Sequence, residues 1–357
     1  MEFMLQPAVY ATGDSNSLLD MLDHMWVKKH TPGEGTLYII SGFTNYNGGV
    51  RFYPVFSDHT RRQGRVVAVV GGSAGQRLSS QQAVEALLAC GVEVYVVNRK
   101  RIVHAKCYGI SDRRGDELLV TSGNFTGPGM TQNVEAALHL EPEETARMRF
   151  SWDGLLKGLF SQGWDIYRLE QADIASRRGP GWTLLYDELH DTVKLDDSQL
   201  VSMVVLLSHS DTARIQAPPA TNAGKGTQYF WLCKDSFDFF PPLTERNRRG
   251  TKNTYSCVIN LYYADLDKHR RERVTFEADN NQDFRLGTGG YRGTRLAEKG
   301  DLAVLTRRRE YDYEIRIIPK AHPGHAKLLS YATQYIGHQG KRFGYIDNTE
   351  LSAVIGV

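Results

Sequence analysis

The sequence predicts an α/β sandwich with a mixed sheet in its first half and a mostly β pseudobarrel in its second half. Up to about residue 163, short apolar runs alternate with segments of helical periodicity, and beyond residue 200 strand-like runs dominate. Short buried strands separated by helices are typical of α/β sandwiches. Short strands joined by long loops rich in Gly, Asn, Arg and Pro are typical of closed or half-closed barrels.

The first half opens with an amphipathic helix over Ser15–Val27, where apolar residues recur at helical spacing behind a possible N-cap at Asp14 or Ser15. The other elements are predicted from apolar periodicity and from the Gly-containing breaks that follow them. We predict strands at Thr36–Ser41, Val66–Val70, Val92–Val97, Ile102–Ile110, Glu117–Ser122 and Val134–Leu140, and helices at Ser80–Cys90 and Glu143–Phe160.

An acidic stretch with weak periodicity separates the two halves. We therefore predict a first domain over 1–180, an acidic linker over 181–199 and a second domain over 200–357. This linker could lie over a basic cleft and hold it closed. The predicted strands of the second domain are Leu200–Leu207, Gln228–Cys233, Ser256–Tyr263, Arg273–Glu277, Leu302–Leu305 and Tyr313–Ile318.

The charge distribution favours a polyanionic partner for the second half. The net charge is only +2, but residues 201–357 carry 23 basic and 17 acidic side chains, whereas residues 1–180 carry 19 of each. The four cysteines show no C-x-x-C spacing, so we expect neither a zinc site nor disulfides. The sequence shows no signal peptide and no apolar segment long enough to cross a bilayer. We expect a cytoplasmic protein without cofactor, metal or membrane contact.

The sharpest local pattern is His104-Ala105-Lys106 on a predicted strand. Residues two apart on a strand project from the same face, so an imidazole and an ammonium share one surface. Asn124 follows the next strand in Ser122-Gly123-Asn124, and Glu135 begins a third strand. Phosphodiester cleavage needs a nucleophile, cationic and amide donors, a carboxylate that orients the nucleophile, and an acid that protonates the leaving oxygen. These residues supply every group except the acid. A second copy of the chain could supply that acid.

This pattern resembles the H-x-K signature of the phospholipase D superfamily, including its S/G-x-N element and trailing Glu. The first domain looks like the nuclease branch typified by the restriction endonucleases BfiI and NgoAVII. One departure is that the Asp expected five residues after the Lys is replaced by Ser111, with Asp112 beside it. The nuclease branch relaxes this position, so the departure argues against a lipase.

The resemblance implies a homodimer that cleaves double-stranded DNA without metal. One His104 would attack phosphorus to form a phosphohistidine, and the His104 of the other copy would protonate the leaving oxygen. Lys106 and Asn124 of both copies would hold the non-bridging oxygens, and Glu135 would fix the imidazole tautomer. The likeness to NgoAVII also implies a separately encoded ATPase subunit as a partner.

Two loops of the second domain combine basic, polar and small residues, as DNA-contacting arms do. This arrangement resembles the plant B-three-type pseudobarrel, which also occurs as the effector domain of EcoRII. The candidate DNA-binding residues are Arg248, Arg249, Lys252, Arg285, Tyr291, Arg292 and Arg295.

The favoured interpretation is a sequence-specific restriction endonuclease of a restriction-modification system. Three alternatives stay open: a non-specific nuclease, a phosphatidyl-transferring enzyme, and a DNA-binding regulator that uses the nuclease-like domain for dimerisation. The single H-x-K motif and the lack of an apolar anchor speak against the phosphatidyl-transferring enzyme. The complete set of catalytic residue types speaks against the regulator.

Overall fold

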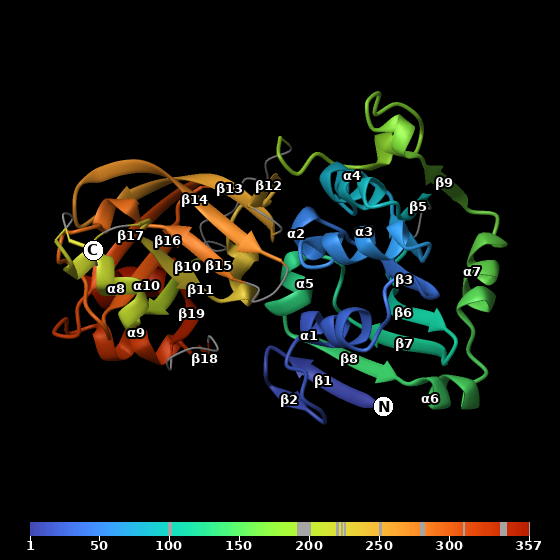
Figure 1. Cartoon of the computed structure of the whole chain (residues 1–357), viewed down its shortest axis with the longest axis horizontal. Helices are drawn as coiled ribbons and strands as arrows, with labels where there is room; N and C mark the ends of the chain where they lie inside the picture. The colour runs from blue at the N-terminus through green and yellow to red at the C-terminus, as the bar shows by residue number, and fades with distance from the viewer. Residues whose placement is uncertain are drawn as a thin grey trace. The chain divides into compact units, whose positions relative to one another are not determined.

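The computed structural model describes residues 1–98, 102–190, 201–218, 221–222, 224, 226–249, 252–278, 283–309, 311–335 and 341–356. The chain divides into two compact units, residues 1–191 and 192–357. Each unit has its own sheet and core (Figure 1).

The first unit contains a mixed sheet with the strand order β2-β1-β8-β7-β6-β3-β4-β5-β9. Strands β3, β4 and β5 run parallel, and the other neighbouring pairs are antiparallel. The strands are β1 (Glu2–Gln6), β2 (Tyr10–Ala11), β3 (Thr36–Ser41), β4 (Arg65–Gly71), β5 (Glu93–Asn98), β6 (Lys106–Asp112), β7 (Gly115–Thr121), β8 (Glu135–Leu140) and β9 (Asp165–Leu169). The predicted mixed-sheet sandwich is thereby confirmed.

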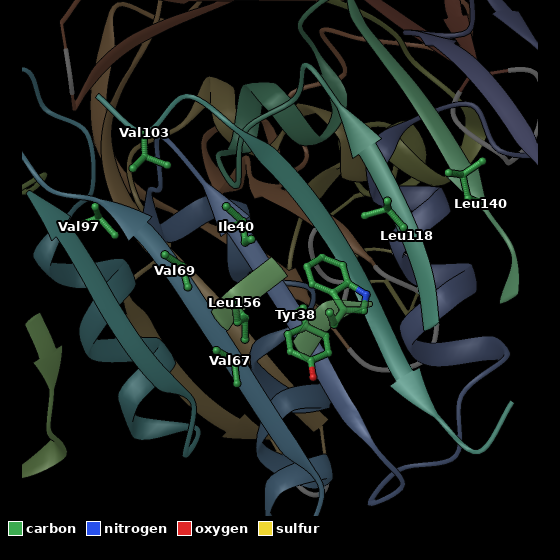
Figure 2. Close-up of a cluster of buried hydrophobic side chains, with 10 residues drawn as sticks. Tyr38, Ile40, Val67, Val69, Val97, Val103, Leu118, Leu140 and Leu156 are labelled. Carbon is green, nitrogen blue, oxygen red and sulfur yellow. The ribbon is translucent and has the colours of Figure 1, made fainter. Parts of the chain in front are cut away.

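Helices lie on both faces of this sheet (Figure 1). On one face, Trp152 and Leu156 of α7 join a core with alternating residues of β3 and β4, among them Tyr38 and Val67 (Figure 2). On the other face, Trp26 packs edge-on against Phe52, Phe56 and Tyr108. The helices are α1 (Leu18–Asp23), the π-helix η1 (His24–Lys28), α2 (Tyr46–Gly49), α3 (Tyr53–Arg61), α4 (Gln81–Ala89), α5 (Gly127–Thr131), α6 (Pro142–Arg147), α7 (Trp152–Phe160), and the 3-10 turns η2 (Gln171–Asp173) and η3 (Trp182–Leu184).

Three predicted elements of the first unit differ clearly from the structure. The helix expected over Ser15–Val27 begins at Leu18 with Ser17 as its N-cap, and it continues as the π-helix η1. The single helix expected over Glu143–Phe160 is two helices, because Arg149 adopts φ +53° and Ser151 then caps α7 by accepting the N–H of Gly154. The strand expected from Ile102 begins at Lys106, since its partner β3 ends at Ser41, the residue paired with Lys106. His104 therefore lies just before the strand.

Residues that we expected to start the acidic linker pack against the first unit. The Trp182 side chain is buried. The Glu188 carboxylate, also buried, accepts hydrogen bonds from the Tyr46 N–H at 2.8 Å and the Ser80 hydroxyl at 2.9 Å. The remainder of the expected linker, 191–199, lies outside the described residues, so its role as a cover for a basic cleft stays a prediction.

A buried pair of histidines connects the end of α3 to the segment after η1. The N–H of Gly33 donates to His59 Nδ1, so that nitrogen is an acceptor, and the ring of His30 donates to it from Nε2 over 3.2 Å. His30 Nδ1 is buried with no hydrogen-bond partner among the described residues, 4.0 Å from Asp112 Oδ2. Burial, together with the neighbouring His59, lowers the pKa of His30 to about 4, and burial lowers that of His59.

These histidines predict that the first unit loses stability in mild acid. The unfolded chain binds protons at His30 and His59 near pH 6.5, whereas the folded chain binds them only at lower pH. The contribution of these neutral histidines to the free energy of unfolding is therefore complete above pH 6.5 and is lost as the pH falls toward 4. For His30 this loss is roughly 3 kcal/mol. Urea unfolding at pH 7.5 and pH 5.0 should show a larger loss for the wild type than for His30→Gln. Equal losses of unfolding free energy in both proteins would contradict this role of His30.

The second unit is mostly strand and forms a curled, half-barrel sheet with the order β11-β15-β14-β13-β17-β16-β10-β19-β18, and β12 pairs with β13. Among the strand pairs that the described residues form in this sheet, only β13 and β17 run parallel. The strands are β10 (Val201–Leu206), β11 (Tyr229–Leu232), β12 (Glu245–Arg249), β13 (Lys252–Tyr263), β14 (Lys268–Glu277), β15 (Phe284–Gly287), β16 (Leu302–Arg307), β17 (Asp312–Ile318), β18 (Gln334–Tyr335) and β19 (Arg342–Asp347). The predicted mostly β second domain is confirmed.

Helices that the sequence pattern did not predict complete this unit. They are α8 (His209–Gln216), α9 (His325–Tyr331), α10 (Asn348–Ile355) and the 3-10 turns η5 (Lys234–Phe239) and η6 (Gly289–Tyr291). Leu328 of α9 and Leu351 of α10 pack against Val204 and Val304 of the sheet. None of the described helices of the chain is long and apolar enough to cross a membrane.

A buried ion pair holds α8, β11 and the start of β19 together. Lys341 Nζ lies 2.8 Å from Asp211 Oδ1 and also donates to the Trp231 carbonyl. The same Asp211 carboxylate accepts the Trp231 N–H at 2.9 Å and the Ser208 N–H at 2.7 Å. Because both charged side chains are almost completely buried, each depends on the other for compensation.

Candidate active site and DNA-binding surface

The structure brings His104 and Lys106 together at the beginning of β6. Val103 and Cys107 point into the core beneath α7, whereas Lys106 Nζ lies 3.0 Å from Nδ1 and 3.1 Å from Nε2 of the His104 ring. It also donates to the His104 carbonyl at 2.9 Å. His104 is exposed and Lys106 is buried, so the imidazole is open to a substrate and the ammonium supports it from beneath.

Burial lowers the pKa of Lys106, and the nearby Glu135 carboxylate opposes that change. Glu135 is itself buried, so the two opposite charges stabilise each other in a partly desolvated site. The result is a positive charge held at a fixed point beside the imidazole, without the freedom of a surface lysine.

The end of β3 forms one wall of the site. Gly42 is required there, because a Cβ at this position would lie 2.5 Å from the Val103 carbonyl oxygen and 3.3 Å from the His104 Cα. Phe43 packs edge-on against the His104 ring, with the ring centroids 6.1 Å apart. The backbone bearing His104 therefore lies directly against the end of β3. Sequence reasoning assigned no role at the site to Gly42 or Phe43, because their contact with the histidine depends on strand pairing.

Asn124 occupies the turn after β7, and its orientation is fixed. Its Oδ1 accepts the Phe43 N–H at 3.1 Å, while among the described residues Nδ2 makes no hydrogen bond and can donate to a ligand. The Tyr108 hydroxyl donates to the Gly123 carbonyl at 3.0 Å, and Thr121 Oγ1 accepts the Gly123 N–H at 2.9 Å. These bonds keep the turn in place against β6.

Glu135 lies at the start of β8 but does not contact His104 within one chain. Ser122 Oγ donates to one of its carboxylate oxygens and Asn133 Nδ2 donates to the other at 3.1 Å. Among the described residues, no hydrogen bond joins Glu135 to the His104 ring. The carboxylate instead accepts the Ser122 hydroxyl and acts electrostatically on Lys106.

A second polar cluster lies at the far ends of β7 and β8, where Glu117, His139 and Glu141 bring ligand atoms within 4.8 Å of one another. The Lys29 ammonium lies 3.0 Å from Glu117 and also pairs with Glu141. His139 Nε2 is 3.2 Å from the second oxygen of Glu117. Lys29 pairs with both carboxylates and the His139 ring lies within hydrogen-bond distance of Glu117, so we assign this cluster a structural role that joins Lys29 to the sheet.

The predicted DNA-binding residues of the second unit occupy different environments. Arg285 lies over the rings of Tyr229 and Trp231, 5.3 and 5.4 Å from their centroids, and pairs with Glu277 at 3.4 Å. Arg292 is exposed and bonded to the Gly224 carbonyl. Arg295 is exposed and adopts φ +62°.

Tyr291 requires a correction, because its side chain is completely buried. The hydroxyl donates to Asp265 at 2.6 Å and the ring packs edge-on against Tyr263. It supports the loop from within and cannot contact DNA in this conformation. The side chains of Arg248, Arg249 and Lys252 lie outside the described residues, although their backbones pair with one another in strands β12 and β13.

Sequence reasoning missed the basic residues of β14. Lys268, Arg270, Arg271 and Arg273 are all exposed, on a strand whose other half, Val274 and Phe276, belongs to the core. The signal is present in the sequence as the run Lys268-His269-Arg270-Arg271, which follows the long apolar strand β13. A run of this kind normally indicates a solvated loop.

Two family models match the chain. Residues 195–357 match the DNA-binding domain of the metal-independent restriction enzyme BfiI. Residues 50–149, which include His104, Lys106, Asn124 and Glu135, match the phospholipase D-like domain described for cardiolipin synthase. No curated protein matches the chain.

Two solved structures are also similar to part of the chain. The phospholipase D family member Nuc from Salmonella typhimurium is 16% identical, with 43% of this chain and 89% of that chain covered and a TM-score of 0.30. A polyphosphate kinase from Porphyromonas gingivalis is 11% identical, with 46% and 22% covered and a TM-score of 0.27. The two family models, one for each unit, fit a BfiI-like restriction enzyme of the phospholipase D superfamily.

Proposed function

We propose that this protein is a sequence-specific restriction endonuclease that hydrolyses DNA phosphodiesters through a phosphohistidine on His104. The observation that carries the proposal is the contact of Lys106 Nζ with the exposed His104 ring, 3.0 Å from Nδ1. A nucleophilic nitrogen and a fixed positive charge side by side suit attack on an anionic phosphorus centre. We assign the nuclease role to the first predicted domain, 1–180, and recognition to the second, 200–357.

The first chemical step forms a bond between a His104 nitrogen and phosphorus as the bond to the leaving oxygen breaks. The His104 ring of a second copy, placed across a two-fold axis, gives its proton to that oxygen. In the second step water attacks the phosphohistidine, the N–P bond breaks, and the second histidine takes up the water proton. Both histidines return to their starting protonation states, so the cycle balances.

The remaining site residues have complementary roles in this proposal. Lys106 and the Nδ2 group of Asn124 hold the non-bridging oxygens, where negative charge increases in the transition state. Glu135 maintains the charge on Lys106. Since no hydrogen bond joins Glu135 to its own His104 among the described residues, we propose that its orienting action applies to the imidazole of the other copy. Paired lysines supply positive charge, so we expect no requirement for a divalent ion.

The second unit would place the dimer on DNA. The match over residues 195–357 supports double-stranded DNA as the partner, and the exposed arginines of β14 and the 292–295 segment offer the basic surface that such a partner requires. The need for a separate ATPase subunit stays a prediction from the resemblance.

The experiment that tests the proposal is cleavage of plasmid DNA in excess EDTA by the wild type and by His104→Ala. We expect cleavage by the wild type only, because removal of the nucleophile should reduce the rate by about 10⁴-fold or more. Wild type quenched with detergent at alkaline pH should carry a DNA adduct that is labile in acid and stable in base, as a phosphoramidate bond is. The reaction is run with and without ATP and host extract, because the extract would supply the predicted ATPase subunit and ATP its substrate.

His139→Ala serves as the matched histidine control, since His139 lies at the opposite end of β8 and belongs to the Lys29 cluster. It should cut DNA at the wild-type rate if it folds, which its thermal unfolding would report. Cleavage that requires Mg²⁺ and persists in His104→Ala would reject the proposal.

A further inference from the structure

A hollow in the second unit combines two arginines from segments that are distant in sequence. It is lined by Gly226, Thr227, Gln228, Arg270, Gly289 and Arg292. Arg270 comes from the exposed part of β14, and Arg292 follows the 3-10 turn η6. The sequence pattern pointed only to the second of these.

Both guanidinium groups are held in place before any ligand binds. Arg292 donates from Nε at 2.8 Å, and also from Nη2, to the Gly224 carbonyl. Arg270 Nε lies 3.7 Å from the Glu272 carboxylate, which the Tyr263 hydroxyl anchors at 2.7 Å. Less conformational entropy is therefore lost when an anion binds than would be lost with free surface arginines.

A third arginine lies beside the hollow. Gly226, at φ +94°, lies between the hollow and Arg214 and has no side chain to separate them. A Cβ there would lie 3.3 Å from Arg214 Nε. The carboxylate next to Arg270, Glu272, has a side chain only 12% exposed, whereas Arg270 is 44% exposed. The accessible charge at this hollow is therefore positive.

We infer that this hollow binds a backbone phosphate of duplex DNA, an inference that rests on the proposed function and identifies a contact surface for it. A phosphodiester offers two charged oxygens to the planar donor sets of Arg270 and Arg292, whereas base edges offer only partial charges. A contact of this kind positions the duplex without reading its sequence. Its contribution should thus be uniform across DNA sequences and should weaken with salt.

The test measures binding of fluorescent 30-base-pair duplexes of three unrelated sequences by the full-length chain. All proteins carry His104→Ala, so that no DNA is cut during the measurement. Arg270→Gln and Arg292→Gln are compared with Arg308→Gln, a control in the same unit whose arginine is also exposed and paired with a glutamate. Affinity is measured from low to physiological salt.

We expect Arg270→Gln and Arg292→Gln each to weaken binding about 5- to 10-fold at low salt, equally for the three sequences. The slope of log affinity against log salt should fall by about 1 in each variant. Arg308→Gln should bind as its parent does. Unchanged affinity and slope, or a loss confined to one sequence, would overturn the inference. Failure of the chain to cleave DNA would reject the proposed nuclease function and leave this binding test intact.

Discussion

Replacing Lys106 by methionine is expected to lower the single-turnover rate of DNA cleavage by roughly 10³-fold, the loss that removal of one preorganised donor to a developing oxyanion can cause. Methionine keeps much of the length of the buried stem but removes the ammonium that lies 3.0 Å from the His104 ring and 2.9 Å from its carbonyl. The transition state then lacks its closest positive charge. The rate should be measured with enzyme in excess over a duplex substrate.

Lys157→Met is the matched control, because Lys157 is an exposed lysine on α7 and takes part in no step of the proposed reaction. Its rate should equal that of the wild type. Lys106→Met should still bind DNA through the second unit, so a loss confined to cleavage supports the proposed role. A Lys106→Met rate within tenfold of the wild type would mean that the ammonium is structural.

Replacing Lys341 by methionine should destabilise the second unit by about 3 kcal/mol, because the substitution leaves the buried Asp211 carboxylate without its counter-ion. Asp211 keeps its bonds from the N–H groups of Ser208 and Trp231, which limits the loss. Urea unfolding followed by tryptophan fluorescence, to which Trp231 contributes from the second unit, would measure it. Since Asp211 fixes β11, we also expect weaker DNA binding.

Lys320→Met is the control for this prediction, since Lys320 is 52% exposed and lies 4.0 Å from its partner Glu298. An exposed pair at this distance contributes little, so its unfolding midpoint should stay within experimental error of the wild type. If Lys341→Met unfolds at the same urea concentration as Lys320→Met, the buried pair does not hold the unit together.

The sequence predicted the six central strands of the first sheet, because their apolar patterns are encoded locally, and missed the edge strands β1, β2 and β9. Alternation along β6 places Cys107 toward the core and Lys106 on the other side, and this pattern needs no knowledge of the partner strands. The orienting role expected for Glu135 stays a prediction, since no hydrogen bond joins it to its own His104 among the described residues. Its distance from His104 depends on how β6 and β8 are placed about β7, which no local pattern encodes.

In the second unit the prediction was weaker for a physical reason. Small and basic residues around 289–295 look exposed in sequence, but the burial of Tyr291 is determined by Tyr263 and Phe230, which pair or pack from other strands. Conversely, the polar first half of β14 looks like a loop and is a strand paired with β13 along its length. Tertiary pairing overrides local composition in both cases.

Gly42, the glycine at the end of β3, has a counterpart in Gly71 at the end of β4. A Cβ at Gly71 would lie 2.5 Å from the Gly42 carbonyl oxygen, just as one at Gly42 would lie 2.5 Å from that of Val103. The place of the imidazole is thus encoded in part by two residues that carry no reactive group. A genetic screen for chains that fold but no longer restrict DNA should therefore recover changes at positions 42 and 71 alongside changes at the polar residues themselves.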